Sequence, residues 1–233
     1  MTHLSTRISG VKGGMTSETD WADQTEQRLL DAALTHAPTT GWSRRLLSKA
    51  AADLHMSLAE AELLLPEGPR DLAALLVRRH DARALQTLGN VDASGLKIRE
   101  RIRAGVLARV GAAMETAEAT RRCMGFLALP TNAALGLRLL WAAADGLWRW
   151  AGDTSTDENH YTKRALLAEI LGTTLAVRLA CGEDAAAAHL DRRIASVMAF
   201  EKWKSGLRPA DLAERFVARL GRLRYGSAAP IQG

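Results

Sequence analysis

The 233-residue sequence contains only two cysteines, Cys123 and Cys181, and both fall within apolar helical patterns. A structural zinc site needs about four ligands at short spacings, and a disulfide framework needs several cysteine pairs, so neither is expected here. The histidines are scattered, without the clustered Glu-x-x-His pattern of a di-iron site. We therefore predict no metal and no cofactor, and interpret both cysteines as core thiols in a reducing compartment.

The usual motifs of catalysis and nucleotide binding are also missing. The sequence has no G-x-S-x-G elbow, no P-loop, no G-x-G-x-x-G turn and no H-E-x-x-H pair. These absences point away from an enzyme, and we assign no catalytic residue. The first 19 residues are polar and rich in Gly, Ser and Thr, with no apolar run of signal-peptide length. Residues 1–19 are therefore predicted to form a disordered tail.

Strand patterns are scarce as well. Alanine, leucine and arginine dominate, while β-branched runs and alternation of polar and apolar residues are rare, so an all-α fold is predicted. The hydrophobic content of 47% is ample for a shared core. The formal net charge of +5 allows attraction to nucleic acid or to anionic lipid and does not distinguish between them.

Residues 20–90 are predicted to form an N-terminal segment of helix-turn-helix type. A first helix runs from Asp20 to His36 and is ended by Pro38 and Gly41. Two short helices then follow, opened by serine caps, and a fourth helix spans residues 71–88. The two serines are Ser43 and Ser57.

A DNA-binding interpretation of this segment meets a difficulty on its second short helix. A recognition helix needs Arg, Lys, Asn or Gln to reach base edges and phosphates. This helix instead carries Glu60 and Glu62, which phosphate would repel. We therefore expect no nucleic-acid partner, while a ligand-responsive transcriptional regulator of TetR type remains the leading alternative function.

Residues 91–205 are predicted to form a helical bundle. An amphipathic helix with Leu96, Ile102 and Val110 is followed by helices at about 115–129 and 131–151, a helix from about Thr156, and one at 183–205. The segment 131–151 is apolar on most sides, so it is predicted to be largely buried.

A polar stretch, residues 151–164, joins two apolar helices of this bundle. Ser155 and Glu158 have capping-box spacing, which predicts a helix start near Thr156. In this helix Leu166, Leu167, Ile170, Thr174 and Val177 fall on the core side. A different face carries Asp157, His160, Tyr161 and Arg164 at spacings of three, four and seven residues, and we predict that it is available to a partner.

Residues 207–226 are predicted to form a basic amphipathic helix after a hinge at Gly206. Its apolar stripe consists of Leu212, Phe216, Val217 and Leu220, with Arg215 and Arg219 outside the stripe. This pattern is typical of a helix that lies in an anionic membrane interface. An ordinary surface helix packed on the body is the alternative.

The stretch from Trp148 to Arg164, continued by Ala165-Leu166-Leu167-Ala168, resembles the signature of the ubiquinone-biosynthesis accessory family of the ninth coenzyme Q protein and its bacterial homologues. A looser similarity covers residues 190–194, and the helix order is similar to the TetR-like fold that this family shares. Three positions depart from the family: Leu171 and Leu175 stand where Tyr and Glu are common, and His160 replaces a Trp.

The resemblance implies a non-enzymatic protein that binds an isoprenoid lipid or quinone intermediate in its bundle. It would present this lipid to the di-iron demethoxyubiquinone hydroxylase at the membrane surface. The implied hydroxylase-binding residues are Leu147, Trp148, Asp157, His160, Tyr161 and Arg164. The implied location is the bacterial cytoplasm, peripheral on the inner membrane, or the mitochondrial matrix side in a eukaryote, and a homodimer is expected.

Overall fold

The computed structural model describes residues 14–153 and 158–206, and within these ranges the chain forms nine α-helices and no strand. The helices are α1 (Gly14–Thr40), α2 (Arg44–Asp53), α3 (Leu58–Leu64), α4 (Pro69–Leu88), α5 (Ile98–Met114), α6 (Ala117–Leu127), α7 (Ala133–Trp150), α8 (Glu158–Cys181) and α9 (Glu183–Gly206). The predicted all-α fold is confirmed for the described part of the chain.

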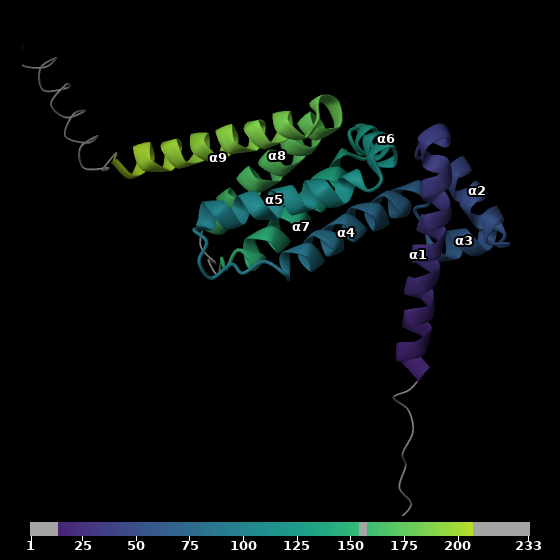
Figure 1. Ribbon diagram of the computed structural model, residues 1–233. Coiled ribbons are helices and arrows are strands. Elements are labelled where there is room, and N and C mark those ends of the chain that lie inside the picture. The colour runs from purple at the N-terminus through teal and green to yellow at the C-terminus, as the bar shows by residue number, and fades with distance from the viewer. Residues whose placement is uncertain (1–13, 154–157, 207–233) are drawn as a thin grey trace, which may run out of the picture.

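Helices α1, α2 and α3 form one end of the molecule, and α4 runs from this end into a bundle with α5, α7, α8 and α9 (Figure 1). The N-terminal end has its own core, in which Leu29, Leu46, Leu47 and Leu72 are fully buried. Trp42 ties this core to α6, because its Nε1 donates to the backbone oxygen of Ala119 over 3.1 Å.

Helix α1 differs from its predicted bounds at both ends. It begins at Gly14, so residues 14–19 are helical where we predicted a disordered tail. A helix fixed by packing gains one backbone hydrogen bond for each residue added, which favours this extension. At the other end, the prediction that Pro38 ends the helix is wrong. Proline there removes only one donor, and Gly41, with φ of +70°, ends the helix one turn later.

The start of α3 follows the sequence pattern closely. The Ser57 hydroxyl accepts the Glu60 backbone N–H over 3.2 Å, and the Ser57 N–H donates to the Glu60 carboxylate over 2.7 Å. This reciprocal pair is a capping box. The helix carries no basic residue, and its carboxylate Glu62 is paired with Arg44 of α2 at 2.6 Å.

The bundle core lies between α5, α7, α8 and α9, where Val106, Leu147, Leu167 and Leu190 are buried. The prediction that the helix at 131–151 is largely buried holds for only one side of α7. Leu137 is 68% exposed, because α4, α5, α6 and α8 pack against the other parts of the helix surface. The large apolar side chain of Leu137 therefore lies on the outer side of α7.

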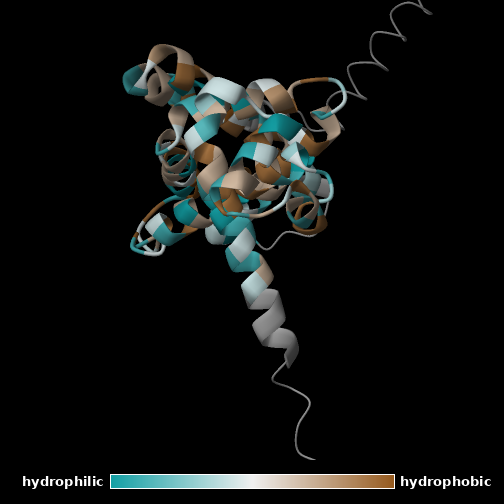
Figure 2. Cartoon of the chain, turned by 90° about the vertical axis from the view of Figure 1, so that its right-hand side faces the viewer, coloured by the Kyte–Doolittle hydropathy of each residue, from teal (hydrophilic) through white to brown (hydrophobic). Residues whose placement is uncertain are grey.

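Helix α9 lies along α8 and α5 and completes the bundle (Figure 1). Hydrophobic residues are spread over the helices of the body, whereas the coloured part of α1 that projects from the body is mainly hydrophilic (Figure 2). Among the helices of residues 14–153 and 158–206, none is both long enough and apolar enough to span a membrane.

Candidate functional site

The candidate site is built around the connection between α7 and α8. Helix α7 ends in a Schellman motif, in which Gly152 N–H donates to Arg149 O and Asp153 N–H donates to Trp148 O, each over 3.0 Å. Gly152 has φ of +89°, a left-handed conformation that glycine adopts without strain. The chain therefore turns sharply after α7, and α8 is described from Glu158, two residues after the predicted start.

Arg164 is buried beneath this turn, with only 2% of its surface exposed. Its Nε donates to Oδ1 of Asp145 on α7 over 2.6 Å, and its Nη1 lies 3.3 Å from Oδ2 of Asp153. Nη1 also donates to the backbone oxygen of His160 over 3.2 Å. One guanidinium thus connects α7, the turn after it and the first turns of α8.

Lys163 and Trp148 add a second connection beside Arg164. The Lys163 ammonium pairs with Oδ1 of Asp153 at 2.8 Å and lies 5.6 Å from the centre of the Trp148 ring. The Trp148 Nε1 donates to the Lys163 backbone oxygen over 3.0 Å. Because charge-assisted hydrogen bonds in a shielded site resist exchange with water, these contacts fix the direction of the α8 start.

Tyr161 stands on this rigid support and is 66% exposed. Its ring centre lies 6.2 Å from that of Trp141 on α7 and 5.2 Å from that of His160, whose ring it meets edge-on. Leu137 lies one helical turn before Trp141 on α7 and is also exposed. We call Leu137, Trp141, His160 and Tyr161 the aromatic patch.

The six predicted hydroxylase-binding residues have different positions in the structure. Tyr161 is exposed, His160 and Trp148 are half-buried, and Leu147 and Arg164 are buried. Asp157 lies outside the described residues. The predicted outward face is thus divided, because the Arg164 guanidinium turns inward to reach Asp145 and Asp153. Trp141 and Leu137 were not predicted, and their i, i+4 spacing on an apolar helix is the only sequence signal for them.

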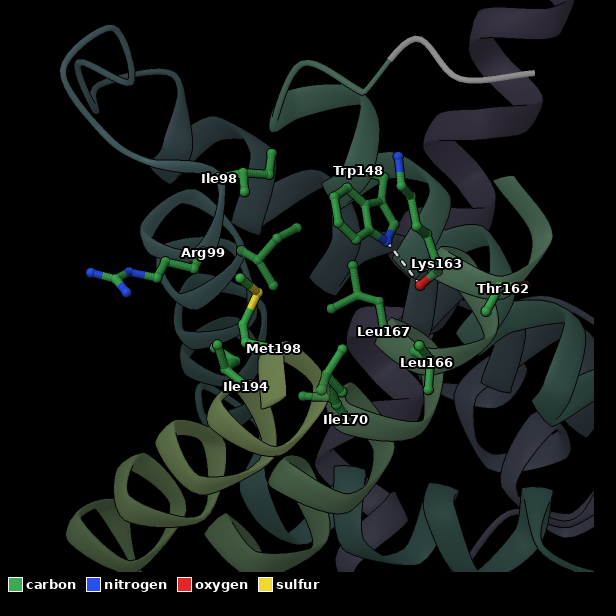
Figure 3. Close-up of a pocket in the computed structure, with 12 residues that line it drawn as sticks. Ile98, Arg99, Trp148, Thr162, Lys163, Leu166, Leu167, Ile170, Ile194 and Met198 are labelled. Carbon is green, nitrogen blue, oxygen red and sulfur yellow. Dashed lines mark hydrogen bonds between the residues drawn. The ribbon is translucent and has the colours of Figure 1, made fainter. Parts of the chain in front are cut away.

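A groove lined mainly by apolar side chains, with a volume of about 220 Å³, lies beside this junction, between α5, α7, α8 and α9 (Figure 3). It is lined by Ile98, Arg99, Ile102, Trp148, Thr162, Lys163, Leu166, Leu167, Ile170, Ile194, Val197 and Met198. The guanidinium of Arg99 points away from the other labelled side chains (Figure 3). Trp148 and Lys163 line the groove and also make the contacts that connect α7 with the start of α8. The groove is therefore next to the junction of α7 and α8.

The two cysteines that we predicted to be core thiols differ in position: Cys123 is buried, whereas Cys181 is exposed, so the prediction is wrong for Cys181. Burial raises the pKa of the Cys123 thiol to about 12, so this thiol remains protonated and is a poor nucleophile. Within residues 14–153 and 158–206, no three His, Cys, Asp or Glu side chains are arranged to hold a metal ion. The predicted membrane-binding residues Leu212, Arg215, Phe216, Val217, Arg219 and Leu220 lie outside the described residues.

The sequence comparisons find that this chain is similar to the proteins of one family. The COQ9 family model matches residues 133–201, which include α7, α8 and most of α9. "Ubiquinone biosynthesis protein COQ9, mitochondrial" of Xenopus tropicalis is 34% identical over 164 residues, covering 67% of this chain and 51% of that protein. The human protein of the same name is 30% identical over 179 residues, covering 74% of this chain and 56% of its own. The family resemblance predicted from the sequence is confirmed.

The alignment with these two relatives spans little more than half of their length. Among solved structures, a TetR transcriptional regulator from Nitrosomonas europaea ATCC 19718 matches with a TM-score of 0.59 and 18% identity, covering 75% of this chain and 98% of that one. At this identity the match shows the fold alone. The predicted TetR-like architecture is confirmed.

Proposed function

We propose that this chain of the COQ9 family is a non-enzymatic accessory protein of ubiquinone biosynthesis, which binds a polyprenyl quinone precursor and presents it to the di-iron demethoxyubiquinone hydroxylase at a membrane. The observation that carries the proposal is the junction of α7 and α8. There an exposed tyrosine, Tyr161, stands on a buried ion-pair network beside an apolar groove. The junction of α7 and α8 lies within residues 133–201, the range that the COQ9 family model matches.

The apolar groove is the proposed site of the isoprenoid chain. Each buried CH₂ group favours an apolar environment by about 0.8 kcal/mol, so a polyprenylated ring stays in the bilayer unless a protein offers comparable contacts. Leu166, Ile170, Ile194 and Val197 provide such contacts from both α8 and α9. A carrier of this kind gives a catalytic site access to a substrate that is nearly insoluble in water.

The aromatic patch is the proposed hydroxylase-binding surface. Exposed aromatic residues held rigidly are suited to be interface anchors, because they bury a large area and lose little conformational entropy. Tyr161 is the central anchor, and Trp141 and Leu137 extend the apolar area along α7. Arg164 is a positioning residue, because its buried hydrogen bonds fix the first turns of α8, which carry Tyr161.

The predicted amphipathic helix at 207–226 is proposed to bring this surface to the membrane. The groove-lining residues Ile194 and Met198 lie at the middle and in the C-terminal half of α9, which ends at Gly206. A helix that continues from this point and lies in an anionic interface would hold the groove close to the lipid. The net charge of +5 favours such contact. Peripheral attachment and a homodimer remain parts of the proposal.

The alternative function, a TetR-type regulator, has support from the fold alone. The described α3 is a seven-residue helix with no basic residue, and its Glu62 forms an ion pair with Arg44 at 2.6 Å. A recognition helix of this composition offers phosphate and base edges few donors. These observations favour the accessory protein.

Mass spectrometry of organic extracts from the purified protein tests the proposal. We expect a copurified isoprenoid lipid, and we expect it to be lost from Ile194→Trp, which fills the groove. Ala195→Trp is the matched control, since Ala195 is exposed on the same helix and does not line the groove. An extract without isoprenoid lipid, or one that is the same for both variants, would argue against the groove as a lipid site.

A further inference from the structure

A polar cleft, which we call the α4–α5 cleft, lies between α4, the end of α5 and the residues that lead into α6. Its volume is about 370 Å³, within the range of about 300–1,000 Å³ that is typical of small-molecule sites. Its polar lining residues are Arg79, His80, Arg83, Gln86, Glu115 and Thr116. None of the residues that line the cleft also lines the apolar groove beside Trp148.

His80 forms the floor of the α4–α5 cleft, and a chain of hydroxyl groups fixes the direction of its hydrogen bond. Only 4% of His80 is exposed. The Thr120 hydroxyl donates to the backbone oxygen of Ala113 over 2.9 Å, so the Thr116 hydroxyl, 3.3 Å away, donates to Thr120. Because this uses the single proton of the Thr116 hydroxyl, Nε2 of His80, at 3.1 Å, must donate to Thr116.

The imidazole of His80 is neutral at pH 7. Burial, and then the charges of Arg109 and Arg79, lower its pKa to about 3. A neutral ring carries one proton, and the chain of hydroxyl groups places this proton on Nε2. Nδ1 of His80 is therefore an acceptor only, and a ligand that meets it must donate a hydrogen bond.

The charges near the floor already have counter-ions. Arg79 pairs with Asp31 at 2.5 Å, and Arg109 pairs with Asp81 at 2.5 Å. Both guanidinium groups still oppose a positive charge on the ring of His80. A cationic ligand would meet the same repulsion, and an ionised carboxylate has no proton to donate to Nδ1. The floor therefore favours an uncharged group that carries a hydrogen-bond donor.

The mouth of the α4–α5 cleft offers donors and acceptors together. Nε of Arg83 donates to Oε1 of Glu115 over 3.3 Å, and both side chains are more than half exposed. Within the described part of the chain, no residue accepts from the terminal nitrogens of Arg83. Gln86, almost one turn further along α4, is exposed, and its amide can both donate and accept. Such a mouth suits hydroxyl groups, because each of them also donates and accepts.

We propose that the α4–α5 cleft binds a neutral molecule with several hydroxyl groups, one of which donates to Nδ1 of His80 while others accept from Arg83 and Gln86. Hydroxyl groups match both ends of the cleft, since the same group is a donor at the floor and an acceptor at the mouth. A neutral ligand also leaves the ion pairs around the cleft in balance. This inference does not depend on the function proposed above, because the cleft and the apolar groove are separate.

Nuclear magnetic resonance of the histidine side chains in the full-length protein tests the floor of the cleft. Long-range correlation of imidazole protons and nitrogens, with His80→Gln to assign the signals, shows which nitrogen carries the proton. We expect His80 to be protonated on Nε2 and to stay neutral at pH 5. A proton on Nδ1, or a charged ring at pH 5, would overturn the inference.

Titration with glucose, glucuronate and glucosamine, which share one ring, tests the charge preference. At pH 6.5, where glucuronate is an anion and glucosamine a cation, we expect glucose to bind at least about tenfold more tightly than either. Glucose should also shift the Nδ1 signal of His80 upfield, as acceptance of a hydrogen bond does. Equal or tighter binding of either ion would overturn the inference. So would the absence of any response both to glucose and to a second neutral polyol, myo-inositol.

Two variants locate the bound sugar. Ala82→Trp fills the cleft from α4, because Ala82 lines it and is exposed. Arg83→Gln removes the guanidinium donors at the mouth. Each is expected to weaken glucose binding by about tenfold. Ala52→Trp is the matched control, since Ala52 is exposed on α2 and does not line the cleft. Undiminished glucose binding by Ala82→Trp would contradict the assignment of the cleft.

The groove-filling variant Ile194→Trp separates this inference from the proposed function. We expect Ile194→Trp to keep glucose binding and Ala82→Trp to keep the copurified isoprenoid lipid, because the two sites share no lining residue. If Ile194→Trp abolishes glucose binding while Ala82→Trp does not, the sugar occupies the groove. That result overturns the inference about His80 and leaves the lipid extraction as a separate test of the groove.

Discussion

Arg164 on α8 donates a hydrogen bond from Nε to Oδ1 of Asp145 on α7 over 2.6 Å, and only 3% and 18% of the two side chains are exposed. The pair joins the two helices directly beneath the exposed Tyr161. The orientation of Tyr161 therefore depends on a buried charge that does not itself reach the surface. A substitution of Arg164 would disturb a partner surface without removing a contact from it.

We predict that Arg164→Ala lowers the free energy of unfolding by about 3 kcal/mol, because it leaves Asp145 and Asp153 without their buried partner. Chemical denaturation monitored by circular dichroism measures the change. Arg149→Ala is the matched control: Arg149 pairs with the same Asp145, but its side chain is 74% exposed. Its loss is expected to cost less than about 1 kcal/mol. Equal losses for the two variants would show that burial of Arg164 is not important for stability.

A second prediction concerns the stability of the folded protein at acidic pH. Burial, with the charges of Arg109 and Arg79 nearby, lowers the pKa of His80 from 6.5 to about 3, so the folded protein keeps this imidazole neutral. Between these two values the unfolded chain binds a proton that the folded chain does not, and stability therefore falls as the pH falls. The loss from His80 on going from pH 7.5 to pH 5 is about 2 kcal/mol.

Urea unfolding at both pH values, in wild type and in His80→Gln, isolates this contribution. The variant replaces the titrating ring with a neutral side chain that retains a donor for Thr116, which His80 contacts at 3.1 Å. We expect the variant to lose less stability in acid by about 2 kcal/mol. The same pH dependence in both proteins would contradict the assignment of a neutral buried His80.

A third prediction concerns the membrane. Deletion of residues 207–233 removes the predicted amphipathic helix and is expected to abolish co-sedimentation with vesicles that contain anionic lipid. A variant with Arg215→Glu and Arg219→Glu should weaken binding to anionic vesicles and change little with neutral ones. If the truncated chain sediments with vesicles as well as the full chain does, the membrane contact lies elsewhere.

A fourth prediction concerns nucleic acid. In gel-shift experiments at physiological salt, the wild type is expected to bind its own upstream DNA no better than random duplex DNA. Glu60→Lys with Glu62→Lys should increase non-specific retention, because it replaces two repulsive charges with attractive ones. Tight, sequence-specific and salt-dependent binding by the wild type would instead favour the TetR-type regulator.

Local sequence signals predicted much of the fold. The serine cap at Ser57, the glycine at the end of α1 and the apolar periodicities of α4 to α9 depend on residues that are close in the chain. The predicted Ser155–Glu158 capping box includes Ser155, which lies outside the described residues. The bounds of α1 were less accurate, since one lost hydrogen bond at Pro38 is small beside the packing that holds the helix. Periodicity reports which residues share a face, but not whether another helix covers that face.

The same limit explains why the sequence predicted only part of the candidate site. The spacing of His160, Tyr161 and Arg164 placed them on one side of α8, and Tyr161 is indeed exposed. Arg164 is buried because Asp145 and Asp153 approach from another helix and from the turn, which spacing along α8 does not report. The Arg109–Asp81 pair joins residues that are 28 positions apart, so it too required the tertiary structure.

The most direct test of the central claim is the affinity of the purified full-length chain for the di-iron hydroxylase, measured for wild type, Tyr161→Ala and Trp21→Ala. Trp21 is the matched control, an aromatic residue on α1 that is 62% exposed, against 66% for Tyr161. We predict that Tyr161→Ala weakens binding by about tenfold or more with unchanged stability, while Trp21→Ala binds like the wild type. Undiminished binding by Tyr161→Ala, or no binding by the wild type, would contradict the claim that the aromatic patch is the surface that binds the hydroxylase.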